Sequence, residues 1–185
     1  MGKIVITTNA TLDGVVQDPD GKEGFRLGGW FGGPGLEEWA ELETAEALAA
    51  EALLLGRHSD EWFAARWNNR TGEWAEKLNS MPKYVVSSTL DDPHWTNATV
   101  VTGDVVAEIA KLKQTVDGEI LVYASYQLVR TLLEHDLADE LRLVVFPVVL
   151  GEGNRLFGDT RTALRLLSTQ TLGGSLAYLT YEITR

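Results

Sequence analysis

The chain has 185 residues, about the length of one domain, and 44% of them are apolar while 23% are charged, which is typical of a globular protein that folds on its own. It contains no cysteine, which excludes disulfides, thiolate metal sites and a cysteine nucleophile. Its formal net charge of −11 disfavours nucleic acid as a partner, because an acidic protein repels a phosphate backbone.

The N-terminal residues predict a strand. Lys3 to Thr8 is an apolar run that ends in threonines, and it lacks the apolar segment and cleavage site of an export signal. No stretch approaches the roughly 18 consecutive apolar residues of a membrane span. We therefore expect a cytoplasmic protein without a membrane partner.

Glycine and proline punctuate residues 21–35, which predicts a long loop of the kind that is often functional. Leu36 to Ala50 follows as a predicted helix with acidic residues in its first turn. Helical patterns then alternate with short apolar runs that are typical of buried parallel strands, namely Leu53 to Gly56, Lys83 to Ser87 and Ile120 to Tyr123.

The last third of the chain changes character. Ser125 to Glu134 predicts a helix with Ser125 as its N-cap, and Glu140 to Leu150 predicts a long strand. Two further β-type runs, Leu164 to Leu172 and Leu176 to Thr184, predict a hairpin. The pattern indicates one α/β domain over residues 1–185, with a mixed, mostly parallel sheet of about eight strands flanked by helices and a C-terminal antiparallel hairpin.

Several catalytic templates are missing from the sequence. There is no Gly-x-Ser-x-Gly elbow, no His-Glu-x-x-His and no phosphate-binding P-loop. The histidines, His58, His94 and His135, are scattered, so we expect no metal site. Gly151-Glu152-Gly153 is only half of a dinucleotide fingerprint.

The candidate ligand-binding residues lie at the ends of the predicted strands, because open α/β sheets bind ligands there. Gly56-Arg57-His58-Ser59 follows one strand, Ser87-Ser88-Thr89 the next, and Ala124-Ser125 the third. Each set is common in an ordinary strand-to-helix turn. Together, on an acidic protein, they indicate a dinucleotide site without the usual glycine fingerprint.

Four blocks of sequence carry a resemblance that spans nearly the whole chain. They are Thr11-Leu12-Asp13-Gly14, Leu54 to Ser59, Met81 to Ser88, and Leu128 to Leu143 followed by Phe146 to Gly153. The chain resembles the dihydrofolate-reductase-like superfamily. Within it, the chain is most similar to the reductase domain of bacterial bifunctional riboflavin-biosynthesis deaminase-reductases, in a stand-alone form. The resemblance implies NADPH as cofactor, a small-molecule substrate and a homodimer.

The resemblance also implies site residues. Arg57 would meet the 2′-phosphate, and Asp13 is the first candidate proton donor, with Glu152 second. The full set expected at the cofactor is Gly14, Gly56, Arg57, His58, Ser59, Ser87, Ser88, Tyr123, Ala124, Ser125, Gln127 and Leu128. Ala124 and Ser125 stand where the superfamily usually has glycines.

Aromatic and acidic residues supply the remaining candidates. Trp30 and Trp67 are the candidates to cover a substrate ring, with core packing as the equal alternative, whereas core packing is favoured for Trp39, Trp62 and Trp74. Dihydrofolate reductases place a carboxylate on the first helix, but none of Glu37, Glu38, Glu41, Glu43 and Glu46 aligns with it. We expect those five to form a solvated acidic face.

The sequence therefore predicts an NADPH-dependent reductase that acts on a small polar heterocycle or a sugar-like molecule. A dihydrofolate reductase and a non-catalytic nucleotide-binding paralogue are the alternatives. Residues 27–55 contain no lysine or arginine, which argues against a phosphorylated substrate. The apolar character of Leu141 to Leu150 and of the final hairpin favours a homodimer.

Overall fold

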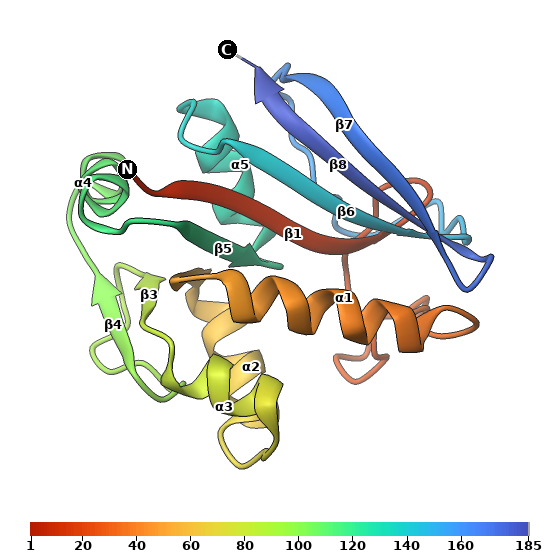
Figure 1. Cartoon of the computed structure of the whole chain (residues 1–185), viewed down its shortest axis with the longest axis horizontal. Helices are drawn as coiled ribbons and strands as arrows, with labels where there is room; N and C mark the ends of the chain where they lie inside the picture. The colour runs from red at the N-terminus through yellow and green to blue at the C-terminus, as the bar shows by residue number, and fades with distance from the viewer. Residues whose placement is uncertain (185) are drawn as a thin grey trace.

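The computed structural model describes residues 1–184 and has eight strands and five helices in that range (Figure 1). The strands are β1 (Lys3–Thr11), β2 (Ala52–Gly56), β3 (Lys83–Val86), β4 (Ala98–Val101), β5 (Glu119–Tyr123), β6 (Glu140–Phe146), β7 (Ala163–Leu172) and β8 (Leu176–Thr184). The helices are α1 (Leu36–Ala49), α2 (Arg57–Trp67), α3 (Glu73–Ser80), α4 (Val105–Thr115) and α5 (Tyr126–Glu134).

All eight strands form one sheet in the order β4-β3-β2-β5-β1-β6-β8-β7. The six strands from β4 to β6 run parallel, whereas β8 pairs antiparallel with both β6 and β7. β1 lies inside the sheet, with Ile4 opposite Ile120 of β5 and Ile6 opposite Leu141 of β6. The mixed sheet and the C-terminal hairpin are as the sequence predicts.

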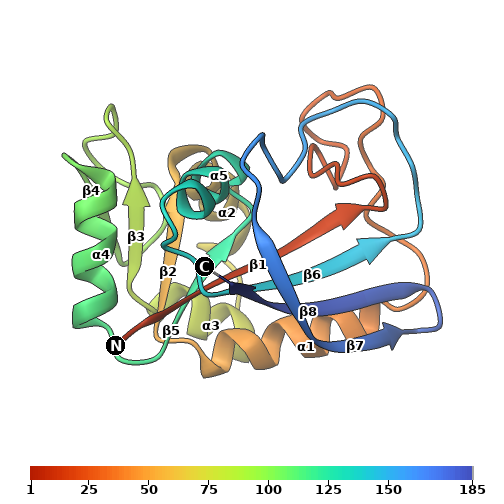
Figure 2. The same cartoon turned by 90° about the horizontal axis from the view of Figure 1, so that it is seen from above.

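Helices cover both faces of the sheet. Because successive side chains of a strand point to opposite faces, Ile4 and Ile6 of β1 pack in a cluster with α4 and α5, while Val5 packs in another with α1, α2 and α3. Figure 1 shows α1, α2 and α3 on one side of the sheet, and Figure 2 shows α4 and α5 on the other. None of these helices is long and apolar enough to cross a membrane.

The structure differs from the sequence-based expectation at two strands. The strand expected from Glu140 to Leu150 ends at Phe146, because Pro147 has no N–H to donate to a neighbouring strand. The short edge strand β4 was not predicted, since its four residues carry no strong apolar run. At the other edge, β7 pairs with β8 alone and is exposed along nearly all of its length.

The long loop after β1 lies beside the segment that follows β6 (Figure 2). Leu12 N donates to the Val148 carbonyl oxygen, and Val15 forms an isolated antiparallel bridge with Arg155. Both segments follow the C-terminal ends of parallel strands, so they meet at the edge of the sheet where a ligand site is expected.

Candidate functional site at the sheet switch point

The connections after β2 and β5 leave in opposite directions. The chain runs from β2 through α2 and α3 to β3 on one side, and from β5 through α5 to β6 on the other. The two strands are neighbours, with Leu53 opposite Leu121, and α2 and α5 cover opposite faces. This arrangement is a topological switch point, which is where open α/β sheets bind ligands.

The turn from β2 to α2 presents a free helix N-terminus. No side chain caps α2, so its first N–H groups are available to an anion. Arg57 Nη1 donates to Thr89 Oγ1 at 3.2 Å, and its Nε lies 3.7 Å from Glu61 Oε1. His58 Nε2 lies 3.5 Å from Glu23 of the long loop. A cation and free amides therefore stand together at this strand end.

The loop from β5 to α5 has an unusual backbone. Ala124 and Ser125 both have positive φ, 48° and 52°, a conformation that glycine adopts at least cost. The loop therefore holds two non-glycine residues in a conformation that favours glycine. Ser125 occupies the N-cap position of α5, as predicted. The prediction that its side chain caps the helix is wrong, because that side chain makes no capping hydrogen bond.

The Ser125 side chain contacts the neighbouring strand end instead. Its Oγ accepts the Gly56 N–H at 3.0 Å and donates to Ser59 Oγ at 2.7 Å. Gly56, Ser59 and Ser125, predicted from two separate segments, are thus brought together.

The other residues expected at the cofactor take different places. Ser87 Oγ accepts from the N–H groups of Thr89 and Leu90, which shapes the turn after β3. The Tyr123 ring packs against Phe63 at 5.6 Å between centroids, and Leu128 lies in the core. Tyr123 and Leu128 can therefore serve a ligand through their backbone only.

Asp13 fixes the turn after β1. Its carboxylate accepts from Thr11 Oγ1 at 2.7 Å, Gly151 N at 2.8 Å and Leu150 N at 3.2 Å. The hydroxyl of Thr11 and these amides lower the pKa of Asp13 to about 2. In the free protein Asp13 is therefore an ionised acceptor that joins two loops, and it stores no proton.

Glu152 and Gly14 belong to the same pair of loops. Glu152 lies at the surface, where its carboxylate accepts from Arg26 at 2.6 Å. Gly14 has a φ of 83°, which the tight turn after Asp13 requires. Neither residue contacts the switch-point groups Gly56, Ser59 and Ser125 within the part of the chain that the structure describes.

The two tryptophans expected at a substrate ring pack in different hydrophobic clusters. Trp30 is half-buried on the long loop, with its ring 5.5 Å from that of Phe146 and its N–H donated to Gln17. Trp67 is 8% exposed and packs on Trp74. It ends α2, about 15 Å along the helix from Arg57, so it lies in the core away from the switch point.

Two acids on α1 are buried, and the expected solvated face is wrong for them. Glu43 is 5% and Glu46 8% exposed, whereas Glu37, Glu38 and Glu41 are exposed as expected. Burial and the neighbouring Glu46 raise the pKa of Glu43 to about 8. Glu43 is thus protonated at neutral pH, and the repulsion between the two acids is avoided.

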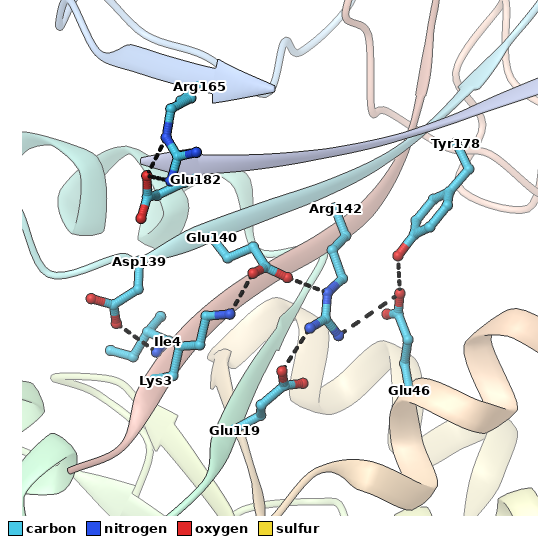
Figure 3. Close-up of polar contacts among 10 residues, drawn as sticks. All are labelled: Lys3, Ile4, Glu46, Glu119, Asp139, Glu140, Arg142, Arg165, Tyr178 and Glu182. Atoms are coloured by element: carbon cyan, nitrogen blue, oxygen red, sulfur yellow. Dashed lines mark hydrogen bonds and ion pairs between the residues drawn. The ribbon is translucent and has the colours of Figure 1, made fainter. Parts of the chain in front are cut away.

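Glu46 faces the charged groups of the sheet (Figure 3). Tyr178 donates its hydroxyl to Glu46 at 2.6 Å, and Arg142 Nη1 lies 3.9 Å from the same carboxylate. Arg142 also donates to Glu119 and Glu140, both at 2.6 Å. These partners come from strands distant in sequence, so no local pattern could reveal them.

No group of three or more His, Asp or Glu side chains in residues 1–184 is placed to hold a metal ion. The groups at the switch point suit a nucleotide phosphate. The N-termini of α2 and α5 flank the switch point without side-chain caps, and such ends bind phosphate through N–H groups and helix dipoles. The fold and this switch point together define an α/β protein of the dihydrofolate-reductase-like class.

Comparison with known proteins narrows the class. Residues 2–178 match the model of the RibD C-terminal domain, and the chain belongs to that family. It is 26% identical to the uncharacterized protein YyaP of Bacillus subtilis over 192 residues, which cover 97% of this chain and 94% of YyaP.

Two solved structures show the same fold. A putative riboflavin biosynthesis protein from Shewanella sp. PV-4 has a TM-score of 0.78 with 22% identity, over 99% of both chains. A dihydrofolate reductase from Enterococcus faecalis, complexed with NADP(H), has a TM-score of 0.60 with 16% identity, over 99% of this chain and 97% of that one.

Proposed function

We propose that the protein is an NADPH-dependent reductase that moves hydride to a carbonyl or imine carbon of a small polar heterocyclic or sugar-like substrate, related to the reductase of riboflavin biosynthesis. The observation that carries the proposal is the switch point, where two uncapped helix N-termini, the Arg57 guanidinium and two serine hydroxyls gather. On a chain of net charge −11, an anionic dinucleotide needs such a local set of donors.

NADPH supplies the hydride when it is bound, and the chain binds and orients it. Gly56, Ser59 and Ser125 would hold the diphosphate. Arg57 at the end of β2, with Ser87 and Ser88 at the end of the adjacent β3, would hold the 2′-phosphate. A guanidinium suits this role because its fork pairs two phosphate oxygens at once.

The reduction also needs a proton. Asp13 is ionised in the free protein, so it could only pass on a proton that it takes up from water, and Glu152 on the neighbouring loop is the second candidate.

Calorimetric titration with NADPH tests the cofactor assignment. We expect one binding site per chain. A wild-type protein that binds no NADPH would contradict the proposed function.

A substrate panel separates the alternatives. Turnover of dihydrofolate would favour a folate reductase, and NADPH binding without turnover of any substrate would favour a non-catalytic paralogue. Among ribosylaminopyrimidines we expect the dephosphorylated form to be preferred, because residues 27–55 carry no cation for a phosphate arm.

A further inference from the structure

Asp60 is a buried acid in the first turn of α2. It is 0% exposed, and it follows Arg57 by three positions on the same helix. Residues three apart on a helix are neighbours on its surface. Both side chains accordingly contact the segment that follows β3, Arg57 at Thr89 and Asp60 at His94. The segment is therefore held to α2 at two points that lie one helical turn apart.

The Asp60 carboxylate holds two consecutive backbone amides. The His94 N–H donates to one of its oxygens at 2.7 Å, and the Trp95 N–H donates to the other at 3.0 Å. The His94 ring Nδ1 also lies 3.2 Å from the first oxygen. Because a carboxylate presents two acceptor oxygens in a fixed geometry, these bonds fix the backbone of residues 94–95 against α2. We call Asp60 with the N–H groups of His94 and Trp95 the Asp60 anchor.

Other contacts hold the far side of the same residues. Asn68, directly after α2, donates to the His94 carbonyl oxygen at 3.0 Å and accepts the Thr96 N–H at 3.1 Å. The buried Lys83 ammonium donates to the Thr96 carbonyl oxygen at 2.8 Å. These contacts fix the segment near the C-terminal end of α2 and the start of β3. Only the Asp60 anchor fixes it near the N-terminus of α2, where the cofactor is expected.

Residues 88–93 lie between the end of β3 and the Asp60 anchor, and they carry groups of opposite use to a phosphate site. Thr89 supplies the hydroxyl that contacts Arg57, whereas Asp91 and Asp92 are exposed acids. Within the described residues, Arg57 pairs with neither acid. A shifted segment could bring one of these carboxylates to the guanidinium, where it would compete with a phosphate. The position of the segment therefore decides which groups lie beside Arg57.

We propose that Asp60 is a positioning residue for cofactor selectivity: its anchor keeps the hydroxyls after β3, and not the acids that follow them, beside Arg57. The inference rests on the proposed function, because it concerns how the site distinguishes NADPH from NADH. Asp60 does not bind the phosphate itself, since its carboxylate is buried and accepts from backbone amides. It acts through the backbone of the segment that it holds.

Asp60→Asn tests the anchor by calorimetry with NADPH and NADH. Asparagine keeps the shape of aspartate but has one acceptor oxygen in place of two, and its NH2 group would oppose one of the two amides. We expect the Kd for NADPH to rise about tenfold and the Kd for NADH to change by less than about twofold. Asp60→Ser, which can accept one amide, should behave alike and serves as the test if Asp60→Asn does not fold.

Three further variants show whether the loss is specific. His94→Ala removes the ring contact but keeps both backbone N–H groups, so it should retain the preference for NADPH. Lys113→Met on α4 removes a buried ammonium that donates to the Leu137 carbonyl oxygen, so it should lower stability and leave both Kd values unchanged. Thr89→Val removes the hydroxyl that the anchor positions. Combined with Asp60→Asn, it should lose no more NADPH affinity than the larger single loss, because both act through one contact.

The outcomes separate the inference from the proposed function. An Asp60→Asn protein that keeps the wild-type preference within about twofold, or that loses affinity for both cofactors equally, would overturn the role of Asp60 and leave the reductase proposal intact. An equal loss in His94→Ala would assign the effect to the imidazole ring and also overturn the backbone anchor. A wild type that binds neither cofactor, or binds both equally, would overturn the proposed function together with this inference.

Discussion

The Arg57 guanidinium donates to the Thr89 hydroxyl, with 3.2 Å between Nη1 and Oγ1, and this contact joins the first residue of α2 to the segment after β3. The same segment holds Ser87 and Ser88. A cation is thus held beside hydroxyls from the adjacent strand end. We propose that this pair lets the site distinguish NADPH from NADH.

Arg57→Ala should remove that discrimination. We expect the wild type to bind NADPH ten to a hundred times more tightly than NADH, if charge-assisted bonds contribute about 1.5–3 kcal/mol. The variant should bind NADH almost unchanged, because only the 2′-phosphate loses its partner. Calorimetry of both cofactors decides the matter, with Arg165→Ala on β7 as control. A preference that survives in Arg57→Ala would refute this assignment.

Ala124→Gly should stabilise the protein. Alanine at a φ of 48° costs about 1 kcal/mol that glycine avoids, so the melting temperature should rise by a few degrees. NADPH binding should tighten or stay unchanged. Ala107→Gly, the same change in the ordinary backbone of α4, should instead destabilise by about 1 kcal/mol. If NADPH affinity clearly fell in Ala124→Gly, the loop would be adapted to another ligand.

Glu43→Gln should change how stability depends on pH. The pKa of Glu43 rises from 4.5 to about 8 on folding, so the folded state binds more protons between these values, and wild-type stability falls as pH rises through them. The stability of Glu43→Gln should not fall in this way, because glutamine does not titrate. At pH 9 it should be more stable than the wild type by on the order of 2–4 kcal/mol, with little difference at pH 4.

Denaturant unfolding at pH 4, 7 and 9 measures the effect. Glu41→Gln on the exposed side of the same helix is the matched control and should show no such trend. Parallel pH curves for Glu43→Gln and the wild type would mean that Glu43 is ionised in the folded protein.

We propose that β7 mediates a homodimer. It is an edge strand, and it exposes Leu164, Leu166 and Leu167 by 38%, 51% and 46%, which is a liability for a lone monomer. Sedimentation at micromolar concentration should give twice the 20.4 kDa of one chain. Leu166→Glu should reduce the mass to that of one chain, whereas Thr99→Glu on the opposite edge should not. A monomeric wild type would exclude the dimer.

The fold could be predicted because its local signals agree. β2, β3 and β5 are short apolar runs, each followed or preceded by a helical pattern, and the Gly173-Gly174 turn marks the hairpin. β4 was not predicted, because an edge strand needs little apolar surface and its sequence carries no strong apolar run. The end of β6 at Phe146 was readable from Pro147, although the apolar residues beyond it suggested a longer strand.

The site was less predictable, because its residues are distant in sequence and are brought together only by strand pairing. Sequence order places Gly56 and Ser59 far from Ser125, and only the pairing of β2 with β5 brings the Gly56 N–H and the two serine hydroxyls together. Likewise, the sequence of α1 predicts a solvated acidic face, but Glu46 is in contact with Arg142 and Tyr178, which lie on strands distant in sequence. Local patterns carry no information on such partners.

The position of β1 inside the sheet also constrains how the chain folds. Its two neighbours, β5 and β6, begin at Glu119 and Glu140, so more than 100 residues that follow β1 must be synthesised before either of its sides is paired. Such distant contacts make folding slow relative to a helical bundle of equal size. Until β6 emerges, a nascent chain holds an apolar strand with an open side, which is the species that a chaperone would need to shield.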